Sequence, residues 1–310
     1  MYSELCRAYQ MSLTAFLLIL SSVLLHALWH FISKRQNPEF IFFIVFSLAI
    51  FLTMFPFFLF SGVIPWRLPF SLWLCILGGG LCGMLGDIGF SYAYRYADIS
   101  QAYPMARALP VLLTALITNI FGFGKPLTLT VSAGMAIIFT GCILMPLPSL
   151  RHFSLSAYRG RGMFGILLAA AATTGYTVID SFGIHGMINF APEASRICSA
   201  GAYSCIREFV VFSSLSLVSF LKTEERKHLS GKLFLQSQPY LAGFFAGLAY
   251  LLVLVAMGYV TNVSYIQAFR QLSLPIGLLL GILILKERAT FQKIAGLALI
   301  LTGLFLVALN

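Results

Sequence analysis

The chain has 310 residues, of which 59% are hydrophobic and only 10% charged, and its mean hydropathy is +0.92. Soluble domains carry about 25% charged residues, so this composition excludes a soluble globular protein. The formal net charge of +10 would suggest nucleic-acid binding in a soluble chain. Here the basic residues fall mostly in short connectors, where they set membrane topology. We therefore expect a polytopic membrane protein that does not bind nucleic acid.

Ten apolar stretches follow one another along the chain, each close to the roughly 20 helical residues that cross a bilayer. They are expected at residues 11–33, 39–61, 70–94, 99–121, 127–147, 162–184, 197–221, 239–260, 263–285 and 290–309. Prolines punctuate them: Pro38 opens the second stretch, Pro126 precedes the fifth and Pro146 closes it. No small-residue cleavage site follows the first stretch, which we interpret as a retained helix.

The second five stretches echo the first five. Gly134–Gly141 aligns with Gly296–Gly303 at an offset of 162, with five of eight positions identical. Small-residue packing motifs would explain this strip alone, but the fourth and ninth stretches also match, with Arg107 before Pro110 and Arg270 before Pro275. Two copies of a five-span unit must insert with opposite orientations. The expected fold is therefore all-α, with ten transmembrane helices in two inverted five-helix repeats (residues 1–147 and 162–310) joined by a basic connector, 148–161.

The loop charges predict an orientation. Seventeen Lys and Arg residues lie outside the helix centres, and thirteen of them fall in the connectors after the odd-numbered stretches or, for Lys293, within a few residues of one. The positive-inside rule places these connectors in the cytoplasm. Both termini are then expected on the opposite side.

Four local patterns occur in order along the chain. They are His26-Ala-Leu-Trp29-His30 with Lys34, Ser100-Gln-Ala-Tyr103-Pro104-Met-Ala-Arg107 with Pro110, Tyr176-Thr-Val-Ile-Asp180 with Gly183, and Arg270 with Leu285-Lys286-Glu287-Arg288. With these patterns the whole chain resembles the EamA-type permeases of the drug/metabolite transporter superfamily. It departs from them in two places: His30 stands where an asparagine is common, and Gly124-Lys125 replaces a glycine-glutamate pair. The resemblance implies a ten-helix secondary transporter with a central cavity, and it does not name the substrate.

Six ionisable residues lie well inside the stretches, where a charge costs a few kcal/mol or more. They are Asp87, Arg107, Asp180, Arg207, Glu208 and Arg270. One interpretation is that they form buried pairs whose charges cancel, and we favour it for Arg207 and Glu208. The other is that they line a polar cavity.

The cavity interpretation rests on polar stripes at helical spacing. Tyr103 with Arg107, Gln267 with Arg270 and Tyr176 with Asp180 each share one helix face, and Asp87 lies on a fourth stripe. Pro104 and Pro110 free backbone carbonyls that water, side chains or substrate must satisfy. Stripes from both repeats are expected to converge on an enclosed cavity.

His26, Trp29 and His30 share a face of the first helix. They either make interhelical hydrogen bonds or act in proton sensing and gating, because imidazole titrates near neutral pH. A zinc site is not expected, since no third ligand is evident. The six cysteines form no C-x-x-C pair, and we expect neither a metal nor a cofactor.

The sequence thus favours a secondary active transporter in the bacterial plasma (inner) membrane, exporting a small polar or zwitterionic metabolite such as an amino acid by alternating access. Substrate binding is assigned to Trp29, Tyr103, Arg107, Tyr176, Asp180, Gln267 and Arg270. Coupling or gating, with protons as the coupling ion, is assigned to Asp180, Asp87, His26 and His30. The alternatives are uptake or exchange of a phosphorylated or nucleotide-linked metabolite, efflux of a drug or cation, and, in a different class, a channel or scaffold. No catalytic constellation suggests an enzyme.

Overall fold

The fold is all-helical in the computed structural model, which describes residues 13–120, 128–147, 158–222, 234–257 and 272–308. Within these residues lie ten α-helices, one short 3₁₀ turn at Pro65–Arg67 and no strand. The helices are α2 (Leu13–Arg35), α3 (Phe40–Ser61), α4 (Phe70–Tyr96), α5 (Ile99–Ile120), α6 (Leu129–Leu144), α7 (Arg161–Phe190), α8 (Arg196–Leu221), α10 (Ser237–Met257), α12 (Ser273–Leu283) and α13 (Phe291–Ala308). Each predicted stretch coincides with one helix, although the ninth was expected to begin outside the described residues.

Five of these helices are long and apolar enough to cross a membrane, namely those at Leu17–Arg35, Phe40–Phe60, Phe70–Tyr96, Arg161–Phe190 and Arg196–Leu221. Four shorter apolar helices accompany them, at Leu129–Leu144, Ser237–Val253, Ser273–Leu283 and Phe291–Val307. Large apolar side chains such as Phe60, Leu129 and Phe291 are exposed, as expected where lipid replaces water. The chain therefore has the fold of an all-helical membrane protein.

The helix ends follow from local chemistry. Pro69 precedes α4, and α3 ends at Gly62 with a φ of +66°, a conformation that suits glycine. The Thr128 side chain accepts a hydrogen bond from the backbone N–H of Val131 and so caps α6. Ser195 caps α8 in the same way.

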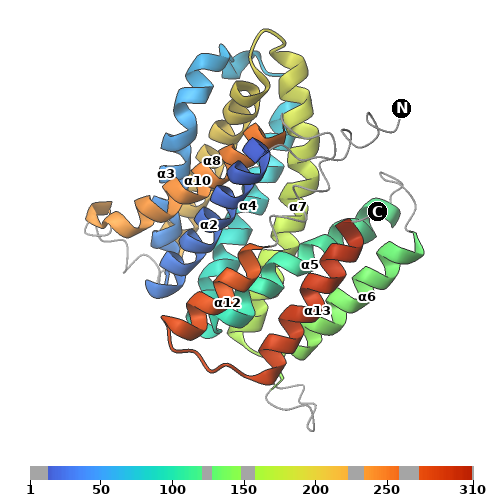
Figure 1. Cartoon of the computed structure of the whole chain (residues 1–310). Helices are drawn as coiled ribbons and strands as arrows, with labels where there is room; N and C mark the ends of the chain where they lie inside the picture. Colours follow the sequence, from blue (N-terminus) through green and yellow to red (C-terminus); the bar gives the residue numbers. More distant parts are fainter. Residues whose placement is uncertain (1–12, 121–127, 148–157, 223–233, 258–271, 309–310) are drawn as a thin grey trace.

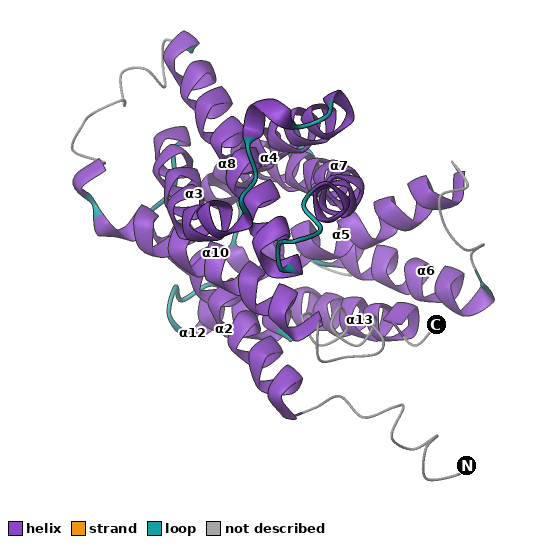
Figure 2. Cartoon of the chain, turned by 90° about the horizontal axis from the view of Figure 1, so that it is seen from above, coloured by secondary structure: helices purple, strands orange, loops and turns teal. Residues whose placement is uncertain are grey.

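The helices fall into two groups. Figure 1 shows α2, α3, α4, α7, α8 and α10 as one bundle, with α5, α6, α12 and α13 gathered beside it. The view from above also places α6 and α13 side by side at the edge of the molecule (Figure 2). Contacts of α5 with α7 and of α12 with α2 join the two groups. The α2, α4 and α5 side chains described below lie at this junction.

Close backbone contacts hold α6 against α13. A Cβ atom added at Gly134 would lie 2.8 Å from the carbonyl oxygen of Gly303, and one at Gly141 would lie 2.7 Å from that of Gly296. The glycines let the two backbones approach to van der Waals contact, as in other small-residue packing of membrane helices. These four glycines are those of the repeated sequence strip, and each copy faces the other in antiparallel register.

Candidate functional site

The first predicted cluster assembles where α2, α4 and α5 meet, and we use the name His30–Arg107 pocket for this set of side chains (His26, Trp29, His30, Tyr94, Tyr103 and Arg107). The Trp29 indole donates to His26 Nδ1 at 3.1 Å. The His30 ring stacks on Trp29 with ring centroids 3.4 Å apart and lies 4.2 Å from the Tyr103 ring. His30 Nδ1 is hydrogen-bonded to the Tyr94 hydroxyl. The aromatic rings thus hold the imidazole in one orientation.

Two nitrogens of this pocket are buried without a partner. Neither His30 Nε2 nor Arg107 Nε has a hydrogen-bond partner within the described parts of the chain. His30 is only 1% exposed, and its ionisable neighbours are Arg107 and His26, both basic residues. A buried polar atom without a partner costs about 1–3 kcal/mol, and a ligand that formed a hydrogen bond with it would remove this cost.

Next to the pocket, four charged side chains hold the turn between α4 and α5, and we call this set the end clamp (Lys34, Asp98, Glu287 and Lys293). Lys34 donates to the carbonyls of Tyr94 and Ala97, each at 2.7 Å. Glu287 accepts the first two N–H groups of α5, those of Ile99 at 2.7 Å and of Ser100 at 3.0 Å. Lys293 pairs with Asp98 at 2.6 Å.

In the end clamp, the residue that caps the start of α5 comes from another part of the chain. Asp98 occupies the N-cap position of α5, where its carboxylate would ordinarily accept the free N–H groups of the first turn. It pairs instead with Lys293 of α13, and Glu287, which follows α12, supplies the cap. A carboxylate is well placed there because the N-terminal end of a helix carries partial positive charge. The clamp therefore ties α2, α4 and α5 to α12 and α13.

The second predicted cluster lies among α4, α7 and α8, and we call it the acidic cluster (Asp87, Asp180, Glu208 and Arg207). Arg207 Nη1 pairs with Asp180 at 2.6 Å and Nη2 pairs with Glu208. The Tyr203 hydroxyl donates to the other Asp180 oxygen at 2.8 Å. The Arg207 guanidinium also lies 5.4 Å from the centre of the Tyr176 ring. One cation thus bridges two carboxylates.

Asp87 joins the same cluster from α4. Its charged neighbours are Glu208 and Arg207. The face that it shares with Ser91 and Tyr94 packs inward, since Ser91 donates to the carbonyl of Pro38 at 2.7 Å and Tyr94 bonds His30. Asp87 and Tyr94 therefore connect the acidic cluster and the His30–Arg107 pocket along one helix.

The predicted site residues thus divide into two groups. Trp29, Tyr103 and Arg107 lie with His26 and His30 in one, while Tyr176 and Asp180 lie with Asp87 in the other. Gln267 and Arg270 fall outside the described residues.

The interpretation of Arg207 and Glu208 as a charge pair agrees with their direct contact. The two side chains leave the helix about 100° apart, but the arginine is long enough to reach back to its neighbour. Sequence reasoning missed Tyr203 as a partner of Asp180. Lys34 and Glu287 occur in the sequence motifs without an assigned role, and the roles of Asp98 and Lys293 were not predicted. Charged residues at helix ends are the signal that would have found the clamp.

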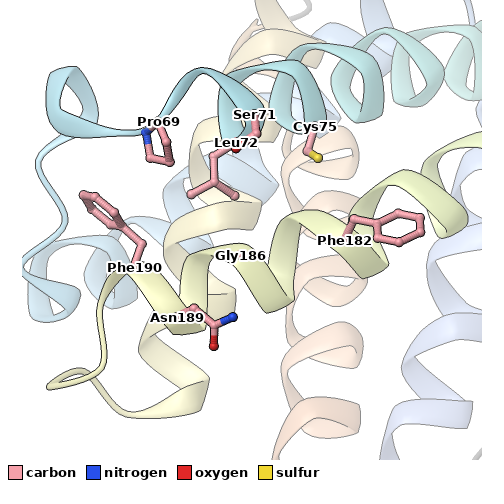
Figure 3. Close-up of a pocket in the computed structure, with 8 residues that line it drawn as sticks. All are labelled: Pro69, Ser71, Leu72, Cys75, Phe182, Gly186, Asn189 and Phe190. Atoms are coloured by element: carbon pink, nitrogen blue, oxygen red, sulfur yellow. The ribbon is translucent and has the colours of Figure 1, made fainter.

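A separate groove lies between the start of α4 and the end of α7, with a volume of about 380 Å³ (Figure 3). It is lined by Pro69, Ser71, Leu72, Cys75, Phe182, Gly186, Asn189 and Phe190. No charged side chain is among these residues, so the groove lacks a group that would select a charged ligand. In the described part of the chain, no three His, Cys, Asp or Glu side chains are grouped to hold a metal ion.

Comparison with known proteins identifies the fold and no family. No family model matches the sequence, and no curated protein matches it. One crystal structure, described only as that of a protein, superposes with a TM-score of 0.53 at 19% sequence identity, covering 95% of this chain and 96% of the other. At this identity the likeness concerns the fold alone, and it extends over nearly all of both chains.

Proposed function

We propose that the chain is a secondary active transporter of the EamA type that exports a small polar metabolite across the plasma membrane by alternating access. The observation that carries the proposal is the His30–Arg107 pocket, where two buried nitrogens lack partners among the described residues. Unsatisfied polar atoms among apolar helices destabilise the protein unless a ligand uses them. A binding site between packed helices, and not at a membrane surface, is what a transporter requires.

The proposal includes ten spans in two inverted repeats, and the helix contacts support this architecture. Exchanging α2, α3, α4, α5 and α6 with α7, α8, α10, α12 and α13, in that order, converts the most extensive helix pairs into one another, although smaller contacts such as α7–α8 have no counterpart of similar size. The α2–α10 pair becomes α4–α7, α3–α10 becomes α4–α8, and α2–α12 becomes α5–α7. The pairs α3–α8, α5–α12 and α6–α13 map onto themselves. Two copies of one fold related by a pseudo-two-fold axis would produce this pattern.

Two features fit a protein that moves between two states: prolines that weaken one helix, and bonds at the helix ends that can form and break. Pro104 and Pro110 lie inside α5, and each removes a helical hydrogen bond next to the pocket. The end clamp adds bonds between α5 and elements from the other half of the sequence. Under alternating access, these bonds hold one end of the pathway closed and break when that end opens.

A channel and a scaffold are the competing classes. A channel needs no buried site that is closed at one end by charged side chains, and its flux does not saturate. A scaffold gains nothing from a buried Arg107 Nε atom without a partner among the described residues, which only lowers its stability. The pocket therefore favours a transporter over both.

Flux into proteoliposomes tests the proposal. Purified full-length protein is first screened against pooled metabolites by thermal unfolding, because a ligand that binds the folded state raises the unfolding temperature. The compound that stabilises the protein is then loaded inside the vesicles, and uptake of the same labelled compound is measured. A transporter gives saturable uptake that the internal compound accelerates. Uptake that rises linearly with concentration and ignores the internal compound would identify a channel instead.

A further inference from the structure

The charge that surrounds Arg107 is the starting observation. Seven of the ten acidic side chains lie in described residues. Four of them form ion pairs: Glu39 with Arg95, Asp98 with Lys293, and both Asp180 and Glu208 with Arg207. The other three also lie elsewhere, because Glu287 caps α5, Asp87 lies beside Glu208 and Arg207, and Glu193 is exposed after α7. None of these seven forms an ion pair with Arg107. The pocket is therefore basic and lacks a counter-ion from the described chain.

The unpartnered atoms are suited to an anion. When the Tyr94 hydroxyl donates to His30 Nδ1, the neutral imidazole carries its proton on Nε2, which then becomes a donor. Arg107 Nε is always a donor. Two buried donors, one of them cationic, can both bond the oxygens of a carboxylate or a phosphoryl group. A cationic ligand would find no acceptor among them.

The carboxylates that could receive an ammonium group lie elsewhere. Both oxygens of Asp180 are already bonded, one to Tyr203 and one to Arg207. Asp87 precedes Tyr94 by seven residues on α4, which separates their backbone positions by about 10 Å along the helix. The ammonium and carboxylate of an α-amino acid are attached to the same carbon atom. With its carboxylate beside Tyr94 in the pocket, such a molecule would have to span this separation along α4 to bring its ammonium to Asp87.

We propose that the His30–Arg107 pocket binds the carboxylate or phosphoryl group of an organic anion and does not recognise an α-amino group. This narrows the expected substrate from a zwitterion to an anion. The inference rests on the proposed function only in identifying the bound anion with the transported substrate. The pocket itself follows from the charges and contacts of α2, α4 and α5.

Four probes that share a phenyl ring test this assignment. Thermal unfolding of the full chain, purified in detergent without added lipid, is followed with phenylpyruvate, phenyl phosphate, phenylalanine and phenethylamine, with potassium chloride as the ionic-strength control. We expect at least one of the two organic anions to raise the unfolding temperature in a saturable way, and phenethylamine to leave it unchanged. Phenylalanine should bind no more tightly than phenylpyruvate. The relative effect of the carboxylate and the phosphate distinguishes the two anionic groups.

Three results would overturn the assignment. They are stabilisation by phenethylamine, at least tenfold tighter binding of phenylalanine than of phenylpyruvate, and no saturable effect of either organic anion beyond that of chloride. Phenylalanine binding at that strength would make a zwitterion the expected substrate again.

Variants locate the bound anion. Arg107→Gln should weaken anion binding by about ten- to a hundredfold, the usual value of a hydrogen bond to a charged group. The anion affinity of Arg107→Lys should lie between those of the parent and Arg107→Gln, because a point charge does not reproduce the planar guanidinium. His30→Phe keeps an aromatic ring against Trp29 and Tyr103 and should also weaken binding. Arg95→Gln, on the same helix as Tyr94 but paired with Glu39, is the matched control and should bind like the parent.

Unchanged anion affinity in both Arg107→Gln and His30→Phe would show that the anion binds elsewhere. Failure of this inference and failure of the transport proposal are separable. Anion binding that depends on Arg107, with no flux in vesicles, would support the anion pocket and contradict the transport proposal. Saturable flux of a cationic or neutral compound would support the transport proposal and contradict the anion pocket.

Discussion

Arg207 offers the sharpest test of how buried charges are balanced in this protein. Its guanidinium bridges Asp180 at 2.6 Å and also pairs with Glu208, whose side chain is 6% exposed. Arg207→Met removes the cation and leaves two carboxylates close together among apolar helices. Tyr203 still donates to Asp180, so one oxygen keeps a partner. Glu208 loses the only ion-pair partner that it has in the described residues.

The expected destabilisation is large. Removing one partner of a buried pair costs about 3–5 kcal/mol, because the remaining charge stays buried without compensation. At about 2–4 °C per kcal/mol for chains of 150–250 residues, the unfolding temperature should fall by on the order of 10 °C. Scanning fluorimetry of the purified protein measures this shift. Arg95→Met is the control, since its ion pair with Glu39 at 3.3 Å is partly exposed and such pairs contribute about 0–1 kcal/mol.

A compensated variant separates charge from shape. Combining Arg207→Met with Asp180→Asn and Glu208→Gln removes all three charges together and should recover most of the lost stability, because a neutral buried set needs no counter-ion. An Arg207→Met protein that unfolds within about 2 °C of the parent would refute this reasoning, since the shift would then match a partly exposed pair. The acidic cluster would in that case be solvated from within the protein.

Two further predictions concern the clamp and the topology. Glu287→Ala leaves the N–H groups of Ile99 and Ser100 without their acceptor and should cost about 1–2 kcal/mol by thermal unfolding, whereas Glu287→Gln keeps one acceptor and should cost less. Equal unfolding temperatures for the parent and the alanine variant would show that water replaces this cap. A reporter active only outside the cytoplasm, fused after Asn310, should give signal, and one active only inside should not; the reverse result would overturn the predicted orientation.

Helix positions were predictable because the bilayer sets the length of an apolar stretch. The ends of α3 and α8 lie within one residue of the predicted 39–61 and 197–221, since glycine, proline and capping residues mark them in the sequence. The α7 helix runs to Phe190, six residues beyond the predicted end at 184. The added residues include the polar side chains of His185 and Asn189. A helix can continue past the apolar stretch because its backbone hydrogen bonds are satisfied internally in either environment.

The pairing of charges was less predictable than their positions. Arg107 and Arg207 both lie inside apolar stretches, and apart from the Glu208 next to Arg207 the periodicity gives only the face on which each lies. Their difference arises from neighbours that are remote in the chain: Asp180 on α7 approaches Arg207, whereas no described acid pairs with Arg107.

Glycines permit the first of these approaches. A side chain at Gly79 of α4 would collide with Asp180, and one at Gly183 of α7 would collide with Tyr203. The small residues that bring α4, α7 and α8 together therefore also neutralise Asp180. Because Asp180 is neutralised there, it is not available to the His30–Arg107 pocket, and that pocket keeps its positive charge for a ligand.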